Sequence, residues 1–390
     1  MTQINEMVAE IQEGLIAFAQ ELVQIQSYSG QEEGAIRCVA AKMRELGYDE
    51  VKIDGMGNVL GRIGQGGKSI LFDAHVDTVA VNDAELWEFP PFSGLVKDGM
   101  LHGRGSVDMK SAVAASVYAG ILAKRLGLAK DRTIYVSTTV FEEDCDGENL
   151  KHMFKEFDLR PDFVMICEPS NGHISIGHKG KAQIAIKTAG VSAHGAAPEK
   201  GVNAIYEMVE IIQRVEQVNL RLLEKEAPRG TLVMSQITSK SASLNAVPSE
   251  CEVYLDRRMM PGETEETVRA EIDEIIGDKN GTWEIGRLQR TCWTGLEFEY
   301  EPIHDAWKID LEHELAQASI AAYQATFAQA PQDYTFWDFS TNAVTPVSLG
   351  IPTIGFGPGD YRLAHMRDER CGIEDIVKAC EFYVQVCARI

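Results

Sequence analysis

Largely apolar runs that alternate with helical segments constrain the fold of this chain most strongly. The stretches SILFDAHV (69–76), RTIYVSTTVF (132–141) and FVMICEP (163–169) show no regular polar alternation. Strands of this kind are buried on both faces, which is typical of parallel sheets covered by helices. The Ala-rich segment SAVAASVYAGILAKRLGL (111–128) has little polar face and fits a buried helix. The pattern predicts an α/β fold with a mostly parallel sheet and helices on both faces.

A second pattern begins near residue 180. The stretch KAQIAIKTAG (181–190) alternates polar and apolar residues, as an antiparallel strand with one solvent-exposed face does. Segments of strand, helix, strand, strand, helix and strand character occur from there to about residue 290, an order typical of a ferredoxin-like α+β unit. Because 390 residues exceed the usual size of one core, we predict an inserted domain. The predicted limits are 1–182 and 294–390 for the α/β domain, and 183–293 for the insertion.

The charge balance argues against some classes of partner. The chain has 37 basic and 59 acidic residues and a net charge of −22, whereas nucleic acids and anionic membranes bind positive surfaces. We therefore expect neither as a partner. No stretch of about eighteen uninterrupted apolar residues occurs, and the N-terminal segment lacks the features of a secretory signal. The eight cysteines form no CxxC pair, so we expect reduced thiols in a cytoplasmic protein.

Acidic and histidine residues follow the predicted strands at their carboxyl ends, where open α/β sheets bind ligands. Two imidazoles and several carboxylates without cysteine suit Zn²⁺, Co²⁺ or Mn²⁺ better than Ca²⁺. His75 and Asp77 are two apart in an extended segment, so Asp77 can take the ring N–H of His75. The ligands are too many for one tetrahedral ion, which favours two ions sharing a bridging carboxylate. The candidates are His75, Asp77, Asp108, Glu142, Glu143, Glu168 and His365.

The motifs around these residues resemble those of one enzyme family. HVD (75–77), GRGSVDMK (103–110), FEED (141–144), CEP (167–169) and AHMRDE (364–369) occur in the order found in the co-catalytic zinc amidohydrolases. That family includes acetylornithine deacetylase, succinyl-diaminopimelate desuccinylase, the aminoacylases and glutamate carboxypeptidase. The resemblance extends over nearly the whole chain, insertion included. DCDGE, CWTGLEFEY, WDFSTNA and GFGPG further resemble the YgeY-like branch of selenium-metabolism-linked hydrolases.

The resemblance implies two metal sites that share one ligand. Asp108 would be the bridging ligand between the two ions. His75 and Glu168 would complete one site, and Glu143 and His365 would complete the other. We expect zinc as the ion, with cobalt or manganese as alternatives.

The resemblance also implies the activity. We expect a hydrolase, an amidohydrolase or metallopeptidase, that cleaves an N-acyl, N-carbamoyl or peptide bond in a small substrate with a carboxylate. Glu142 would be the general base acting on a water held between the two metals, and Asp77 would orient His75. Members of the family often have a cis peptide bond after the bridging aspartate, here Asp108–Met109.

The insertion resembles the lid and dimerisation domain of the family. GVSAHGAAPEKGVNA (190–204) matches the segment whose histidine, here His194, binds the substrate carbonyl or stabilises the oxyanion. The histidine often does so across a homodimer, so both an action within one chain and one across the dimer stay open. LNAVPSECEVYLDRRMMPGET (244–264) matches the stretch that supplies Asn245 and an arginine for the substrate carboxylate. The register favours Arg258 over Arg257, and a guanidinium suits bidentate binding of a carboxylate.

The acidic stretch FEEDCDGE (141–148) also allows a different class of protein. Glu142, Asp144 and Asp146 are spaced like the ligands of an EF-hand calcium loop, which would indicate a binding protein. The first and twelfth positions of such a loop hold Glu142 and Met153 instead of Asp and Glu, and the stretch follows a strand, so we reject this alternative. A catalytically idle family member that binds a metal or a metabolite is the other alternative. Neither a metal ligand nor the base is missing from the sequence, as it would be in such a member.

The remaining acids of this stretch have a simpler interpretation. Asp144, Asp146 and Glu148 are expected to be turn and helix-start residues, where acids stabilise a helix N-terminus. Two positions depart from the family pattern: Ser111 replaces a frequent glycine, and Asn342 replaces a frequent aspartate. The second departure leaves the substrate open.

Overall fold

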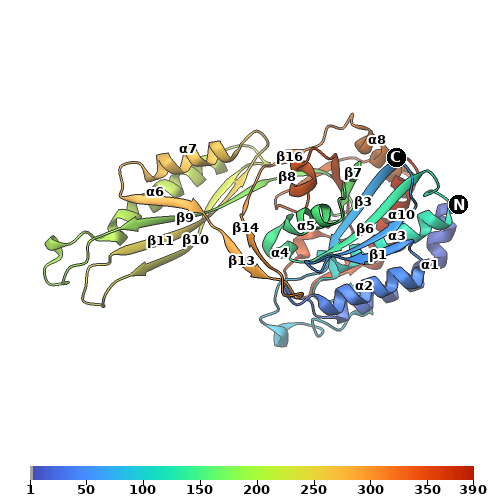
Figure 1. Cartoon of the computed structure of the whole chain (residues 1–390), viewed down its shortest axis with the longest axis horizontal. Helices are drawn as coiled ribbons and strands as arrows, with labels where there is room; N and C mark the ends of the chain where they lie inside the picture. The colour runs from blue at the N-terminus through green and yellow to red at the C-terminus, as the bar shows by residue number, and fades with distance from the viewer. Residues whose placement is uncertain (1–2) are drawn as a thin grey trace.

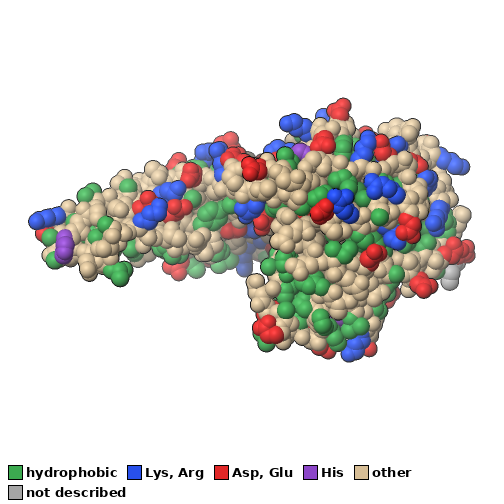
Figure 2. Space-filling view, turned by 60° about the horizontal axis from the view of Figure 1, so that its bottom comes forward, with side chains coloured by type: hydrophobic (Ala, Val, Ile, Leu, Met, Phe, Trp, Pro, Cys, Tyr) green, Lys and Arg blue, Asp and Glu red, His purple; other side chains and the backbone are tan. Residues whose placement is uncertain are grey.

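The protein has two parts, which we call the body and the arm (Figure 1). The structure is a computed structural model and describes residues 3–390. A nine-stranded sheet forms the centre of the body, and a five-stranded sheet forms the arm. Both labelled chain ends lie in the body, so the arm is an insertion between two segments of the body (Figure 1). The arm projects as a narrow extension from the larger body (Figure 2).

The body sheet is mixed, with a parallel centre. Its strand order is β1-β2-β6-β3-β7-β18-β8-β16, and β17 pairs with β8. The pairs β6–β3, β3–β7 and β7–β18 are parallel, whereas the strands at both edges are mainly antiparallel. The predicted parallel core is therefore present, and antiparallel edges widen it. The strands are β1 (Glu50–Ile53), β2 (Val59–Ile63), β3 (Lys68–His75), β6 (Arg132–Thr139), β7 (Phe163–Ile166), β8 (Ile174–His178), β16 (Trp307–Lys308), β17 (Tyr334–Trp337) and β18 (Thr353–Gly355).

Helices pack against this sheet and complete the core of the body. The Ala-rich helix α3 (Ser111–Arg125) is buried along nearly its whole length, as its small polar face predicted, and packs against α1 and α10. All eight cysteines of the chain are free. Among residues 3–390, no helix is both long and apolar enough to cross a membrane. The other body helices are α1 (Gln3–Gln24), α2 (Glu33–Leu46), α4 (Glu142–Cys145), α5 (Glu148–Glu156), α8 (Glu314–Phe327), α9 (Val344–Ser348) and α10 (Ile373–Cys387).

The arm has the strand and helix order expected for a ferredoxin-like unit. Two helices lie along one face of its sheet (Figure 1). On β11, Cys251, Val253 and Leu255 are buried in the arm's own core, while the alternate residues Glu252 and Tyr254 are only partly buried. The period of two therefore separates a covered face from an open one. The elements are β9 (Gly180–Ala189), α6 (Ala204–Leu223), β10 (Thr231–Lys240), β11 (Glu250–Met259), α7 (Glu265–Ile276) and β12 (Gly281–Ile285).

Two short crossings connect the arm to the body. Only Lys179 separates β8 of the body from β9 of the arm. On the return, β15 (Ile303–His304) pairs with β9, and β16 pairs with β8 directly afterwards. The arm sheet thus includes a few residues beyond the limits 183–293, which we keep as the proposed core of the insertion. The remaining strands are β13 (Leu288–Thr291) with β14 (Glu297–Tyr300), and β4 (Leu95–Lys97) with β5 (Met100–His102) and β19 (Arg370–Gly372).

Candidate metal centre

The carboxyl ends of neighbouring strands bring the candidate residues together. β3 ends at His75, α4 begins at Glu142 just after β6, and Glu168 follows β7. His365 lies in the loop after β18, and Asp108 lies in a helical turn, Ser106–Lys110, that precedes α3. Because β6, β3, β7 and β18 are adjacent and parallel, their carboxyl ends meet at one edge of the sheet.

Asp108 lies between two histidines. One carboxylate oxygen, Oδ1, is 3.0 Å from His75 Nε2, and the other, Oδ2, is 3.2 Å from His365 Nε2. On the first side, His75 Nε2 is 3.5 Å from Glu168 Oε1. On the second side, His365 Nε2 is 2.9 Å from Glu143 Oε2. This arrangement gives two groups of donor atoms that share the Asp108 carboxylate, and the Asp108–Met109 peptide bond is cis.

Glu142 lies beside the first group. Its Oε2 is 3.8 Å from His75 Nε2, and its side chain is 9% exposed. Donor atoms of His75, Glu142 and Glu168 all lie within 4.8 Å of one another, as do those of His75, Asp108 and Glu143. Glu142 and Glu143 are adjacent in sequence, yet Glu142 lies beside the group of His75 and Glu143 contacts His365 in the other group.

The buried cluster contains more carboxyl groups than imidazoles, and their pKa values reflect this. Burial raises the pKa of Glu142 and that of Glu168 well above their usual values, and it raises the pKa of Glu143 to about 7. Burial alone would lower the pKa of His75, but the carboxylates around it, Glu168 first, raise it well above its usual range. Hydrogen bonds to Asp108 and Glu143 raise the pKa of His365 to about 10. The carboxylates therefore need more cationic charge than two imidazoles supply.

The donor set fits divalent metal ions. Imidazole nitrogens and carboxylate oxygens are the ligands of zinc, cobalt and manganese sites, and a bound dication would supply the missing positive charge. Cys145 and Cys167 are buried nearby but contribute to neither group of donor atoms. Burial raises the pKa of both thiols, so they behave as small buried apolar side chains.

Asp77 contacts more than the ring of His75. The Nδ1 atom of His75 lies 3.0 Å from the backbone carbonyl of Asp77 and 3.5 Å from its carboxylate. The carboxylate accepts the backbone N–H groups of Glu142 and Glu143, each at 3.1 Å, and the hydroxyl of Ser29 at 2.8 Å. The hydrogen bond predicted from spacing thus involves mainly the carbonyl, which leaves the carboxylate to hold the N-terminal turn of α4.

Arg104 and Glu369 are functional candidates that the sequence did not predict, although they lie in the motifs GRGSVDMK and AHMRDE. The two side chains form a buried ion pair at 2.6 Å. Glu369 accepts the backbone N–H of Asp108 at 3.1 Å, and Arg104 donates to the backbone carbonyl of His365 at 3.3 Å. His365 has a left-handed backbone with φ of 61°, which is unusual for a residue with a side chain. The pair therefore holds two segments that carry donor atoms.

Asn342 and Asp146 differ from their expected roles. Asn342 is 2% exposed; its amide donates to Asp73 Oδ2 at 2.8 Å, and its carbonyl oxygen accepts the N–H of Gly147 at 2.8 Å. It therefore supports the segment behind the site and is not in a position to select a substrate. Asp146 lies in the turn between α4 and α5, as expected, but it is buried and bonded to Lys181, which the interpretation as a turn acid did not include. The buried lysine lies 35 positions further along the chain, and no local pattern indicates that contact.

The structure does not bring the three arm candidates to the metal centre. His194 and Asn245 are exposed and lie beside each other, with the N–H of Gly195 donating to the Asn245 carbonyl at 2.6 Å. Arg258 is partly buried and pairs with Asp256 at 2.7 Å. Within residues 3–390, no hydrogen bond or ion pair joins any of these three residues to the donor groups. By contrast, Arg257 is buried and paired with both Glu263 and Glu271, so its guanidinium stabilises the arm itself.

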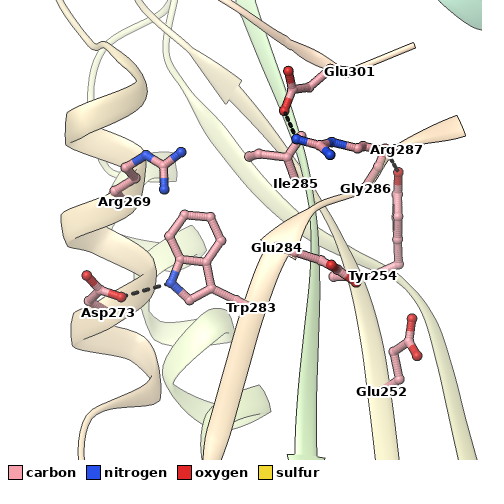
Figure 3. A pocket seen from close by; sticks show the side chains of 11 residues that line it. Glu252, Tyr254, Arg269, Asp273, Trp283, Glu284, Ile285, Gly286, Arg287 and Glu301 are labelled. Atoms are coloured by element: carbon pink, nitrogen blue, oxygen red, sulfur yellow. Dashed lines mark hydrogen bonds and ion pairs between the residues drawn. The ribbon is translucent and has the colours of Figure 1, made fainter. Parts of the chain in front are cut away.

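A separate hollow of about 710 Å³ lies on the arm around β12 (Figure 3). Trp283 donates to Asp273 at 2.8 Å, and the Arg269 guanidinium lies over the Trp283 ring at 5.3 Å from its centre. Arg287 pairs with Glu301 at 3.2 Å on the other side of the strand (Figure 3). The lining carries more carboxylates than guanidinium groups, and none of its residues belongs to the candidate metal centre.

Comparison with known proteins identifies the family. The sequence matches the model of peptidase family M20/M25/M40 over residues 71–389. It is 36% identical to the protein YgeY of Escherichia coli (strain K12) over 387 residues, 98% of this chain and 96% of YgeY. It is 27% identical to the acetylornithine deacetylase of Photorhabdus laumondii over 350 residues, 86% of this chain and 85% of that protein. The fold is similar to that of aminopeptidase PepT from Bacillus cereus, with a TM-score of 0.73, 20% identity and coverage of 97% and 98%. The chain belongs to peptidase family M20/M25/M40.

Proposed function

We propose that this protein is a metal-dependent hydrolase that cleaves an N-acyl, N-carbamoyl or peptide bond in a small substrate bearing a carboxylate. The Asp108 carboxylate, which offers one oxygen to the side of His75 and the other to the side of His365, carries the proposal. Membership of a peptidase family supports hydrolysis of an amide or peptide bond. A deacetylase and a desuccinylase among the relatives support a small substrate.

In this proposal the centre binds two divalent ions, with zinc as the expected ion and cobalt or manganese as alternatives. His75, Asp108 and Glu168 would hold one ion, and Asp108, Glu143 and His365 the other. When bound, such ions activate water and polarise a carbonyl as Lewis acids. The buried carboxylates support this assignment because they require a cation to remain ionised together.

Glu142 is the proposed general base. Its side chain is buried beside the donor groups, and Asp77 holds its backbone N–H, so the backbone from which the carboxylate extends is held in place. Glu142 takes a proton from the attacking water and returns it to the leaving nitrogen, a role that needs a carboxylate within reach of both. A carboxylate that held a metal with both oxygens could not do this, so the proposal requires Glu142 to keep at least one oxygen free.

We further propose that the protein acts as a homodimer through the arm. His194 and Asn245 are exposed on the arm, and their hydrogen bonds are to neighbouring residues of the arm. In a dimer, the arm of one protomer would therefore supply these residues to the metal centre of its partner. Exposed apolar side chains on α6 and the edge strand β10 support such contact, among them Tyr206, Leu220 and Ile237. There His194 would stabilise the oxyanion and Asn245 with Arg258 would bind the substrate carboxylate.

A substrate panel tests the proposal. Protein reconstituted with zinc, cobalt or manganese is assayed against N-acyl amino acids, N-carbamoyl amino acids and dipeptides, in parallel with Glu142→Gln. We expect the wild type to hydrolyse at least one class, and the variant to keep its metal while losing at least ~10²-fold in activity. Full activity of Glu142→Gln on a verified substrate would refute its role as the base. A metal-loaded wild type with no activity on any class would favour the idle binding module.

A mixing experiment tests the action of His194 across the dimer. Glu142→Gln and His194→Ala are each expected to be inactive, and a mixture of the two should recover activity, because a mixed dimer has one centre with both residues intact. Recovery would be absent if His194 acted within its own chain. Analytical ultracentrifugation of the wild type provides the oligomeric state independently.

A further inference from the structure

A buried ionic cluster lies where the arm meets the body. The Asp146 carboxylate is 3% exposed, and its Oδ1 accepts hydrogen bonds from the Lys181 ammonium and from the Tyr300 hydroxyl. Lys181 and Tyr300 are themselves 8% and 1% exposed. The Tyr300 oxygen also lies 2.9 Å from His304 Nε2, and the Lys181 ammonium lies over the Tyr300 ring. We call Asp146, Lys181 and Tyr300 the joint.

The joint touches both crossings between body and arm. Lys181 is the second residue of β9, on the outgoing crossing, and His304 is on β15, on the returning one. The two residues face each other in the β9–β15 pair. A Cβ added at Gly180 would lie 2.5 Å from the His304 carbonyl oxygen, so the crossings approach more closely there than a side chain allows. Tyr300 ends β14 just before the returning crossing.

The other side of the joint is the turn that carries Glu142 and Glu143. Asp146 directly follows α4, whose four residues begin with these two glutamates. At its N-terminal end α4 is held by Asp77, which accepts the N–H groups of both. At its C-terminal end the Asp146 carboxylate is a buried side-chain anchor, next to Gly147, whose backbone is hydrogen-bonded to Asn342 and Thr345. A change in the crossings therefore acts on α4 from the end that Asp77 does not hold.

The Asp146 carboxylate stays ionised despite its burial. Burial favours the neutral form of the Asp146 carboxyl, but the Lys181 ammonium outweighs it and lowers the pKa of Asp146 well below its usual range. Removal of one partner from a buried ion pair leaves an uncompensated charge in the interior, and such a loss is far more disruptive than that of a surface pair. Because the pair joins the turn after α4 to β9, the loss of either partner affects both segments.

We infer that Asp146, Lys181 and Tyr300 are positioning residues that couple the orientation of the arm to the position of α4. The contacts of these three residues support the coupling between the arm and α4. That the coupling also affects catalysis by Glu142 and metal binding by Glu143 rests on the proposed function. Neither the family assignment nor the metal centre alone requires such a joint, since the donor groups come from other strand ends of the body.

Hydrogen exchange tests the coupling without any substrate. Lys181→Met is compared with wild type and with Lys187→Met, which removes a partly exposed lysine further along β9 whose partner is Glu284. We expect Lys181→Met to raise amide exchange of the segment 140–148 by at least about tenfold, through local opening of α4. Lys187→Met should leave that segment within about twofold of wild type. Unchanged exchange at 140–148 in Lys181→Met, or an equal rise in Lys187→Met, would overturn the inference.

A smaller change in the joint separates its effect from global unfolding and allows its effect on activity to be measured. Tyr300→Phe removes only the hydroxyl that donates to Asp146, and its ring packing is retained. We expect kcat to fall by on the order of 10-fold to 10²-fold, the usual effect of a small misplacement of a catalytic group, with little change in KM or metal content. An unchanged kcat together with unchanged exchange at 140–148 would contradict the joint. Changed exchange in a protein whose wild type hydrolyses nothing would retain the joint and reject the proposed function.

Discussion

Asn342→Asp tests the structure behind the metal centre. Asn342 is buried, donates from its amide to Asp73 Oδ2 at 2.8 Å and to the Thr139 hydroxyl at 3.1 Å, and accepts from Gly147 N–H. The substitution keeps the shape of the side chain but replaces the donor by a carboxylate that faces Asp73. Loss of a hydrogen bond to a charged, buried acceptor, with repulsion added, costs about 3 kcal/mol of unfolding free energy. For a body of this size that corresponds to a decrease of roughly 5 °C in Tm.

The loss of stability in Asn342→Asp should depend on pH, and the direction of that dependence follows from the two carboxyl groups. Burial already raises the pKa of Asp73, and a second carboxylate beside it raises the pKa of the pair further, so the folded variant holds a shared proton. The folded state then binds more protons than the unfolded state, and the variant gains stability as the pH falls. The Tm difference from wild type should therefore be larger at about pH 8 than at about pH 5.

Differential scanning fluorimetry at several pH values measures this difference. The double variant Asp73→Asn with Asn342→Asp exchanges donor and acceptor across the same contact, and it should recover much of the lost Tm. An Asn342→Asp protein as stable as wild type at pH 8, or a deficit that grows towards acid pH, would refute the assignment of Asn342 as an internal donor to Asp73.

Three further predictions concern the supports of the site and the effect of metal. Glu369→Gln keeps the shape but loses the charge that pairs with Arg104; metal content measured by elemental analysis should fall, and a fully loaded variant would argue against this support. Gly180→Ala places a Cβ 2.5 Å from the His304 carbonyl, so it should lower Tm, whereas Gly67→Ala, whose Cβ would meet nothing within 4 Å, should be neutral. Removal of metal by a chelator should lower Tm and re-addition of zinc should restore it, since a bound ion stabilises the folded state by mass action; an identical Tm in both states would contradict binding at this centre.

Much of the fold follows from local patterns in the sequence. The apolar stretches at 69–76 and 132–141 became the adjacent parallel strands β3 and β6, because strands covered on both faces carry no polar alternation. The alternation at 181–190 became the antiparallel strand β9 of the arm. The antiparallel edges of the body sheet were less apparent, because a short edge strand such as β16 has only two residues and no period to detect.

Some residues of the site could likewise be predicted from local sequence, and others could not. Residues at strand ends, such as His75 and Glu168, could be predicted together because parallel strands end at a common edge. Arg104 and Glu369 could not, since an arginine in a glycine-rich loop and a glutamate near the C-terminal helix are typical of surface charges. Only their position within motifs that also carry Asp108 and His365 was a signal. Lys181 has no such signal, because its contact with Asp146 depends on how two chain segments cross in space.

The metal content of the purified protein tests the central claim most directly. Protein stripped with a chelator is reloaded with zinc, cobalt or manganese, dialysed and measured by elemental analysis together with its concentration. We expect about two ions per chain for wild type and for Arg362→Ala, an exposed control in the loop of His365. His365→Ala should hold about one, because His75, Asp108 and Glu168 remain. A wild type that takes up none of the three metals, or a His365→Ala variant that still holds two ions, would contradict the two-site account.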